Sequence, residues 1–205
     1  MHDQTLVDAT VLHSALARCC DALEAAAPEL NALDGCLGDG DLGATLSKCA
    51  ANIRELLVAA PTTLDDLLKG CAQACARASG SSFGTLLALA FLTAAKSIGE
   101  RAALDRAGLV ELLDGVEAAL SQRGGAVQGD KTMLDSLAAI ASALRHARDG
   151  APSALKTMVR AAAQEALDAF RNRPNRIGRA RMFAQRSIGL DDPGMVAVQR
   201  MVQAL

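Results

Sequence analysis

Residues 109 to 120 read Leu109-Val110-Glu111-Leu112-Leu113-Asp114-Gly115-Val116-Glu117-Ala118-Ala119-Leu120. The large apolar side chains of this stretch recur at i, i+3, i+4, i+7 and i+11, which is the spacing of one buried face of an α-helix. Two further stretches repeat the pattern, over residues 12–23 and over residues 155–170. No segment alternates convincingly between apolar and polar residues. The sequence therefore predicts an all-α protein.

Helix-breaking segments divide the chain into roughly eight predicted helices. They fall at about residues 27–43, 59–63, 79–84, 122–131, 149–152, 172–178 and 189–194. Thr62, followed by Asp65, is typical of a variant capping box and predicts a helix that runs to about Ala78. No linker is long enough to divide domains, so we expect residues 1–205 to form one domain.

The composition excludes several classes of protein. The chain has 205 residues, no Trp, no Tyr, four Phe and a formal net charge of −2. An aliphatic core is expected, and nothing favours attraction to nucleic acid or to an anionic membrane. The first residues lack the features of a signal peptide, and the longest apolar stretch, residues 86–95, is too short to cross a bilayer. We expect a cytoplasmic protein without a nucleic-acid or membrane partner.

The cysteines and histidines form no recognisable site. Cys71 and Cys75 are spaced i, i+4, but no matching Cys or His pair follows that would complete a metal site. The three histidines are scattered along the chain. We expect the six cysteines to be reduced, mostly buried small side chains.

Three aspartates, Asp34, Asp39 and Asp41, lie within eight residues in a glycine-rich run. Crowded carboxylates repel one another unless a cation joins them, and sites made only of oxygen suit Mg²⁺ or Ca²⁺. An EF-hand is excluded, because the twelfth position is Thr45 when counted from Asp34 and Ala50 when counted from Asp39. A Mg²⁺ site fits better, since Mg²⁺ commonly takes a few carboxylates together with phosphate oxygens. A solvated surface turn is the alternative.

Two more loops precede predicted helices. Residues 79–85 combine glycines with hydroxyl side chains, a composition that suits a phosphate but is also ordinary for turns and helix caps. Residues 124–132 nearly imitate a P-loop. However, Asp130 separates Gly129 from Lys131 and no strand precedes the loop, so a P-loop is rejected.

A fourth segment carries three arginines, Arg179, Arg181 and Arg186, within eight residues. They could form a solvated helix face, or they could contact phosphate through paired hydrogen bonds.

Taken in order, these segments resemble the dihydroxyacetone kinase L-subunit family (DhaL), over essentially the whole chain. The matching motifs are Leu30-Asn31-x-Leu33-Asp34, Gly38-Asp39-Gly40-Asp41-x-Gly43, Gly129-Asp130-Lys131-Thr132-Met133-Leu134-Asp135, Gly178-Arg179-Ala180, Arg186-Ser187-Ile188-Gly189 and Asp192-Pro193-Gly194.

The resemblance implies a barrel of about eight mostly antiparallel helices, with ADP or ATP and two Mg²⁺ ions at one end. By resemblance, Asp34, Asp39 and Asp41 would hold the metals. The other implied nucleotide contacts are phosphate contacts at Leu42, Gly43, Ala44, Thr45, Ser81 and Ser82, an adenine pocket at Gly124 and Met133, and C-terminal contacts at Arg179, Asp192, Pro193 and Gly194. No catalytic side chain is expected, because phosphoryl transfer mainly requires positioning and charge neutralisation.

The resemblance further implies a phosphotransferase subunit that acts on dihydroxyacetone or a similar small ketose together with a separate DhaK-like substrate subunit. The phosphoryl donor stays open between ATP and a DhaM-like phosphocarrier, and a homodimer also stays open. Leu42 stands where the family commonly has His, and Arg181-Met182 stands where it commonly has Ser-Tyr. These departures keep two alternatives open: a nucleotide-bound regulatory subunit that binds a transcription factor or other protein, and a plain helical interaction module.

Overall fold

The computed structural model describes residues 7–59, 61–78, 82–148 and 151–205. Within these ranges the chain forms eight α-helices, one 3-10 helix and one pair of two-residue strands. In chain order the elements are β1 (Val7–Asp8), α1 (Ala9–Leu37), α2 (Leu42–Val58), α3 (Leu64–Arg77), α4 (Ser82–Ile98), β2 (Ala103–Leu104), α5 (Arg106–Gly124), α6 (Met133–His146), α7 (Pro152–Arg171), η1 (Arg179–Ser187) and α8 (Pro193–Gln203). The two strands pair antiparallel. The all-α prediction is confirmed.

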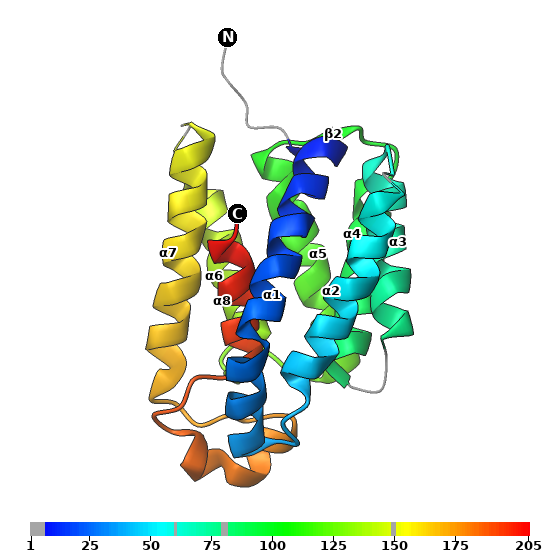
Figure 1. Cartoon of the computed structure of the whole chain (residues 1–205). Coiled ribbons are helices and arrows are strands. Elements are labelled where there is room, and N and C mark those ends of the chain that lie inside the picture. Colours follow the sequence, from blue (N-terminus) through cyan, green and yellow to red (C-terminus); the bar gives the residue numbers. More distant parts are fainter. Residues whose placement is uncertain (1–6, 60, 79–81, 149–150) are drawn as a thin grey trace.

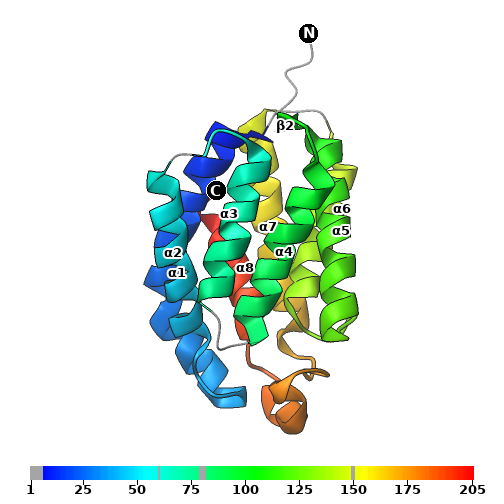
Figure 2. The same cartoon turned by 90° about the vertical axis from the view of Figure 1, so that its right-hand side faces the viewer.

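The helices form a barrel in which sequence neighbours pack side by side and run in alternating directions (Figure 1). The ring closes because α8 packs against α1 as well as against α6 and α7 (Figure 2). The α1–α2 connection, the α5–α6 connection and the segment that carries η1 lie together at one end, the lower end in Figure 1. Polar segments that are far apart in sequence are thereby brought to one place.

The core is aliphatic, as the composition predicts. Val116 and Leu120 of the 109–120 stripe are buried beside α3, α4 and α6, and the remaining leucines of that stripe are partly buried. All six cysteines are free, and four of them are buried, whereas Cys36 is exposed. Burial raises the pKa of the Cys71 thiol to about 12, so this thiol stays protonated and behaves as a small apolar side chain.

The predicted break at residue 27 is wrong, because α1 continues through Pro28 to Leu37. A proline inside a helix removes one hydrogen bond and typically costs about 3 kcal/mol. Here the turns on both sides of Pro28 bury apolar side chains, including Leu23 and Leu30, in the barrel interior. Tertiary burial thus outweighs the local signal, and the extended helix brings Asp34 into its last turn.

The start of α3 also differs by one residue from the prediction. Thr63, and not Thr62, is the N-cap, and its hydroxyl oxygen accepts a 3.1 Å hydrogen bond from the backbone N–H of Asp66. The same hydroxyl donates to the Asp66 carboxylate at 2.8 Å. The capping pattern Thr-x-x-Asp occurs in both registers of this sequence, and the burial of Leu64 selects the second.

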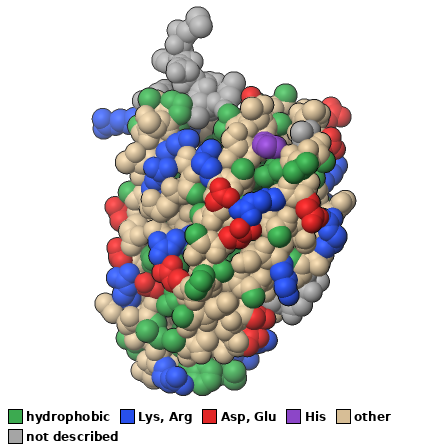
Figure 3. Space-filling model, in the orientation of Figure 1, with side chains coloured by type: hydrophobic (Ala, Val, Ile, Leu, Met, Phe, Trp, Pro, Cys, Tyr) green, Lys and Arg blue, Asp and Glu red, His purple; other side chains and the backbone are tan. Residues whose placement is uncertain are grey.

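The surface carries both signs of charge. On the face seen in Figure 3, basic and acidic side chains are interspersed and do not form patches of one sign. This face therefore offers no uniformly basic surface for a nucleic-acid backbone. Within the described ranges, none of the helices combines the length and the apolarity that a bilayer crossing demands.

Gly43 fixes the close approach of α2 to α1. A Cβ atom added at Gly43 would overlap the backbone carbonyl of Ala27 and would lie 2.8 Å from Oδ1 of Asn31. Because the obstacle is backbone, it cannot move aside without separating the two helices. Gly43 thus sets the spacing of α1 and α2 at the end of the barrel where the aspartates lie.

We expect Gly43→Ala to lower the free energy of unfolding by about 1–3 kcal/mol, because it overpacks a helix–helix contact. Gly115→Ala is the matched control, since a Cβ atom there meets nothing within 4 Å. In that helix interior, alanine should instead stabilise the protein by about 0.5–1 kcal/mol. Urea unfolding of both variants tests this, and equal effects of the two substitutions would contradict it.

Candidate functional site

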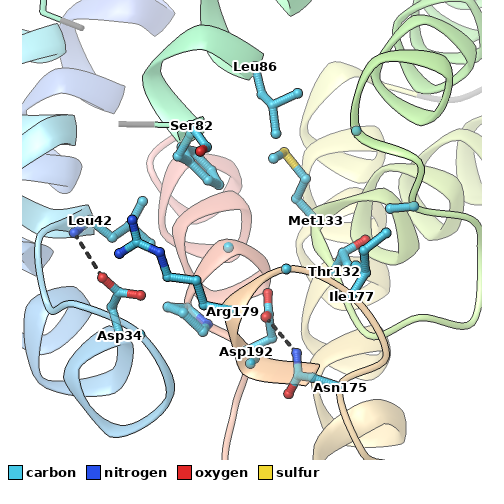
Figure 4. Close-up of a pocket in the computed structure, with 18 of the residues that line it drawn as sticks. Asp34, Leu42, Ser82, Leu86, Thr132, Met133, Asn175, Ile177, Arg179 and Asp192 are labelled. Atoms are coloured by element: carbon cyan, nitrogen blue, oxygen red, sulfur yellow. Dashed lines mark hydrogen bonds between the residues drawn. The ribbon is translucent and has the colours of Figure 1, made fainter. Parts of the chain in front are cut away.

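A cavity of about 890 Å³ opens at the end of the barrel where the polar segments meet (Figure 4). Its wall has an acidic part from the α1–α2 connection, an apolar part from α4, α5 and α6, and a third part from the segment that leads through η1 into α8. The residues that line it include Asp34, Asp39, Asp41, Leu42, Ser82, Leu86, Gly124, Met133, Asn175, Ile177, Arg179, Arg181, Asp192, Pro193 and Gly194.

The three predicted metal ligands lie together in the acidic part. One carboxylate oxygen from each of Asp34, Asp39 and Asp41 lies within 4.8 Å of the other two. Asp34 is in the last turn of α1, Asp39 is in the connection, and Asp41 directly precedes α2. The Asp41 carboxylate makes no capping hydrogen bond to α2, which leaves it free to bind a cation.

Glycines and backbone amides shape this cluster. A Cβ atom at Gly38 would lie 2.5 Å from Oδ1 of Asp34, and Gly40 has a φ of +76°, a conformation that side chains disfavour. Oδ2 of Asp34 accepts hydrogen bonds from the backbone N–H groups of Asp41 at 2.9 Å and Leu42 at 3.3 Å. The Asp34 carboxylate is thus oriented by the start of α2.

This donor set fits Mg²⁺. All three ligands are carboxylates, which hard divalent cations prefer, and three negative charges at this spacing repel one another without a cation. One of the three, Asp39, forms an ion pair with Arg179 of η1. The pair brings a guanidinium group across the cavity to the acidic cluster (Figure 4). The carboxylate cluster and this arginine together could hold a Mg²⁺–phosphate group.

The predicted phosphate-contact residues are only partly in the cavity wall. Leu42 lines the cavity, whereas Gly43, Ala44 and Thr45 do not. The backbone N–H of Ala44 donates to Oδ1 of Asn31 at 3.1 Å, and the Thr45 side chain is buried.

The two predicted serines have different outcomes. Ser82, at the start of α4, lines the cavity, whereas Ser81 lies outside the described residues.

The apolar part of the wall contains both predicted adenine-pocket residues, Gly124 and Met133. Leu86 faces Met133 across this part of the cavity, and Ile177 lies nearby (Figure 4). Leu86 and Ile177 were not predicted, since an apolar residue in a helix or loop gives no sequence signal for a ligand. An apolar slot beside an acidic cluster suits a ligand with a flat ring and a charged tail.

Lys131, the lysine of the near P-loop, does not line the cavity. Its side chain is fully buried, and Nζ donates to the backbone carbonyls of Arg171 at 3.0 Å, Arg173 at 2.8 Å, Ser187 at 2.8 Å and Leu190 at 2.7 Å. The rejection of a phosphate-binding P-loop therefore agrees with the structure. Burial lowers the pKa of Lys131, which Asp192 and Asp191 partly oppose.

Asp192 and Asn175 join the C-terminal segment to the cavity wall. Asp192 caps α8 through a 2.9 Å hydrogen bond from the backbone N–H of Met195, and it accepts a second bond of 2.9 Å from Nδ2 of Asn175. Oδ1 of Asn175 is buried without a hydrogen-bond partner among the described residues. Asn175 was not predicted, because an isolated asparagine in a loop carries no sequence signal for a ligand site.

The chain was compared with known proteins. A model of the DAK2 domain matches residues 36–205. The ADP-binding subunit DhaL of the PEP-dependent dihydroxyacetone kinase of Escherichia coli is 31% identical over 195 residues, which cover 93% of this chain and 92% of that subunit. Human triokinase/FMN cyclase is 32% identical over 93% of this chain but 33% of its own length. The chain thus spans about a third of the triokinases it matches.

Among solved structures, the native dihydroxyacetone kinase of C. freundii superimposes with a TM-score of 0.74 at 24% identity. The match covers 95% of this chain and 34% of that kinase. The similarity shows a shared fold and agrees with the expected helical barrel.

The half-buried Asp192 should make stability depend on pH. Desolvation raises the pKa of Asp192 to about 6 in the folded protein, although the bonds from Met195 and Asn175 and the charge of Lys131 lower it. Because the pKa of Asp192 is higher in the folded than in the unfolded protein, Asp192 adds to the free energy of unfolding at low pH. This stabilisation is complete below the unfolded-state pKa of 3.8 and is lost as the pH rises through about 6.

We therefore expect the wild type to gain stability relative to Asp192→Asn, by up to about 3 kcal/mol, when the pH falls from 7 to 4. Urea unfolding of both proteins in the presence of a chelator measures this difference. A difference that stays constant with pH would show that Asp192 does not titrate in this range.

Proposed function

We propose that this chain, which belongs to the DAK2 domain family, is the Mg²⁺–nucleotide-binding phosphotransferase subunit of a dihydroxyacetone-type kinase. The observation that carries the proposal is the cluster of three carboxylates at the edge of a cavity with an apolar wall. The similarity to the E. coli ADP-binding subunit supports it, since that similarity extends over nearly the whole of both chains.

In this proposal the residues divide the ligand between the two sides of the cavity. Asp34, Asp39 and Asp41 would hold two Mg²⁺ ions, which when bound neutralise phosphate charge and orient the phosphoryl group. Arg179 and the hydroxyl of Ser82 would contact the phosphates. The base would lie in the apolar slot, with Gly124 and Met133, and Asp192, Pro193 and Gly194 would border it.

A separate substrate subunit is part of the proposal. The described cavity wall contains no Cys, His or Lys that could act as a nucleophile or bind a carbonyl substrate covalently. Phosphoryl transfer does not require such a residue, but the acceptor must be held by something. We therefore propose a DhaK-like partner that presents a short ketose at the open side of the cavity.

The acceptor and the donor are distinguishable by experiment. L-erythrulose 1-kinase of Mycolicibacterium smegmatis, 32% identical over 86% of this chain, is named for a four-carbon ketose, so erythrulose belongs beside dihydroxyacetone among the candidates. For the donor, ADP that stays bound through dialysis would indicate a phosphocarrier, and an exchanging site would indicate ATP.

No feature of the cavity favours the regulatory alternative, because the carboxylate cluster is complete.

We expect Asp39→Ala to weaken Mg²⁺–ADP binding by about 100-fold or more, since even the outer partners of metal ligands typically contribute 10–100-fold to affinity. Calorimetry measures the affinity. Thermal unfolding provides a second measurement, because a ligand at a hundredfold excess over Kd stabilises the native state by about 2.7 kcal/mol. Glu55→Ala, an exposed carboxylate farther along α2, is the control and should bind normally. Unchanged binding by Asp39→Ala would remove Asp39 from the site.

We further expect the purified chain, mixed with a DhaK-like subunit, Mg²⁺ and either ATP or a phosphocarrier system, to phosphorylate dihydroxyacetone or erythrulose. Asp41→Ala should abolish the activity, because it removes a carboxylate from the cluster. The assay detects the sugar phosphate by mass spectrometry. If Mg²⁺–ADP binds but no short ketose is phosphorylated with either donor, the kinase proposal is wrong and only nucleotide binding stands.

A further inference from the structure

The Lys131 ammonium group is a buried charge for which the proposed nucleotide binding has no use. Nζ lies 2.7–3.0 Å from four backbone carbonyl oxygens, and within the described ranges it forms no ion pair with a carboxylate. Shells made only of carbonyl oxygens are also how proteins hold K⁺. The surroundings of Nζ are therefore those of a cation site that a lysine side chain occupies.

The hydrogen-bond count favours the charged form of Lys131. An ammonium group has three N–H donors that the four carbonyls can share, whereas a neutral amine has two donors and a lone pair that would face an acceptor. Charge-assisted bonds of this length are among the stronger hydrogen bonds in proteins. Without the ammonium group, the carbonyls of Arg173 and Leu190 would lose the donor that they share in this buried space, whereas those of Arg171 and Ser187 would keep only the backbone bonds from Gly189 and Leu190.

The four carbonyls come from the segment that carries the C-terminal wall of the cavity. Arg171 ends α7, Arg173 follows it, Ser187 ends η1, and Leu190 precedes α8. One cation thus joins the beginning and the end of the excursion that brings Arg179 to the acidic cluster. The backbone N–H of Gly189 bonds to the Arg171 carbonyl at 2.9 Å and closes the same excursion.

The backbone of Lys131 is tied to the same segment. The Lys131 carbonyl accepts a 2.9 Å bond from Nδ2 of Asn175, and the Asn175 backbone N–H donates to Oγ of Ser187 at 2.8 Å. Lys131 has a φ of +63°, which is unfavourable for a residue with a side chain and persists only where the surroundings enforce it. Thr132 and Met133, the next two residues, line the cavity. Lys131 therefore connects this part of the wall to the C-terminal segment without lining the cavity itself.

We propose that Lys131 is a positioning residue whose ammonium group acts as an internal cation, holding residues 171–190 over the cavity, and that its four-carbonyl shell can accept NH₄⁺ or a small alkylammonium ion when the lysine is removed. The expected hydrogen exchange and trypsin resistance of residues 171–190 do not depend on the proposed function. The expected effect on Mg²⁺–ADP affinity rests on the proposed function.

The first experiment compares Lys131→Ala with Lys131→Met. Alanine leaves the shell empty, whereas methionine fills the space with a neutral side chain. Trypsin reports on the segment because five potential cleavage sites, Arg171, Arg176, Arg179, Arg181 and Arg186, lie within it. We expect both variants to keep a helical barrel by circular dichroism, to be cleaved in this segment about tenfold faster or more, and to bind Mg²⁺–ADP at least about tenfold more weakly.

The second experiment tests the cation site itself. At equal ionic strength, NH₄⁺ or n-propylammonium should restore trypsin resistance and Mg²⁺–ADP affinity to Lys131→Ala, while tetramethylammonium, which cannot donate hydrogen bonds, should not. Lys131→Met should show no rescue, since its shell is filled. Lys156→Ala, an exposed lysine of α7, is the control and should match the wild type throughout. A role limited to packing would not give rescue that depends on the hydrogen-bonding ability of the cation.

A third measurement covers variants that fail to fold. In the wild type, hydrogen exchange should protect the amides of Gly189 and Arg176 about as strongly as those of neighbouring helices, since both bond within the clamped region. Fast exchange at these amides, wild-type trypsin resistance of Lys131→Ala, or rescue by every cation alike would each overturn the proposal. If the wild type binds no Mg²⁺–ADP, the proposed function fails while the trypsin and exchange results still decide the role of Lys131.

Discussion

The bonding of the Lys131 ammonium group to four backbone carbonyls is the interaction on which the functional end of this barrel depends. The eight helices can pack through aliphatic side chains alone, but the segment after α7 has few apolar residues and leaves the barrel for about twenty residues. Such a segment needs polar contacts to hold one conformation. The buried Lys131 ammonium group provides several polar contacts at one position. The positions of Arg179 and Asp192 depend on these contacts.

The acidic part of the site depends on a different constraint, the close contact of α1 with α2. Gly43 permits the contact, Gly38 leaves room for the Asp34 carboxylate, and burial of α1 beyond Pro28 extends the helix far enough to include Asp34. The result is three carboxylates held close together, which is electrostatically unfavourable without a cation. Local features that oppose stability are expected where a protein binds a ligand, and here the surrounding helices compensate.

The helical barrel explains how one part of the wall can be acidic and another part apolar within a single cavity. The barrel places the connections of non-adjacent helices at one end, so residues that are more than a hundred positions apart become neighbours. The proposed phosphotransferase needs little else from this chain, because positioning and charge neutralisation account for most of phosphoryl-transfer catalysis. Holding the acceptor falls to the proposed substrate subunit.

Spacing along the sequence determined the helices, the aliphatic core and the aspartate cluster, because helical periodicity and the proximity of Asp34, Asp39 and Asp41 are local properties. The motif resemblance also pointed to part of the cavity wall, including Met133 and Asp192. Only the tertiary structure decided that α1 passes through Pro28, that Lys131 faces carbonyls and not a phosphate, and that Asn175 belongs to the wall. Each of these depends on burial or on hydrogen bonds to partners that the chain brings together only by folding. Lys131 and Leu190, for example, are 59 positions apart in the sequence. No local pattern encodes such contacts.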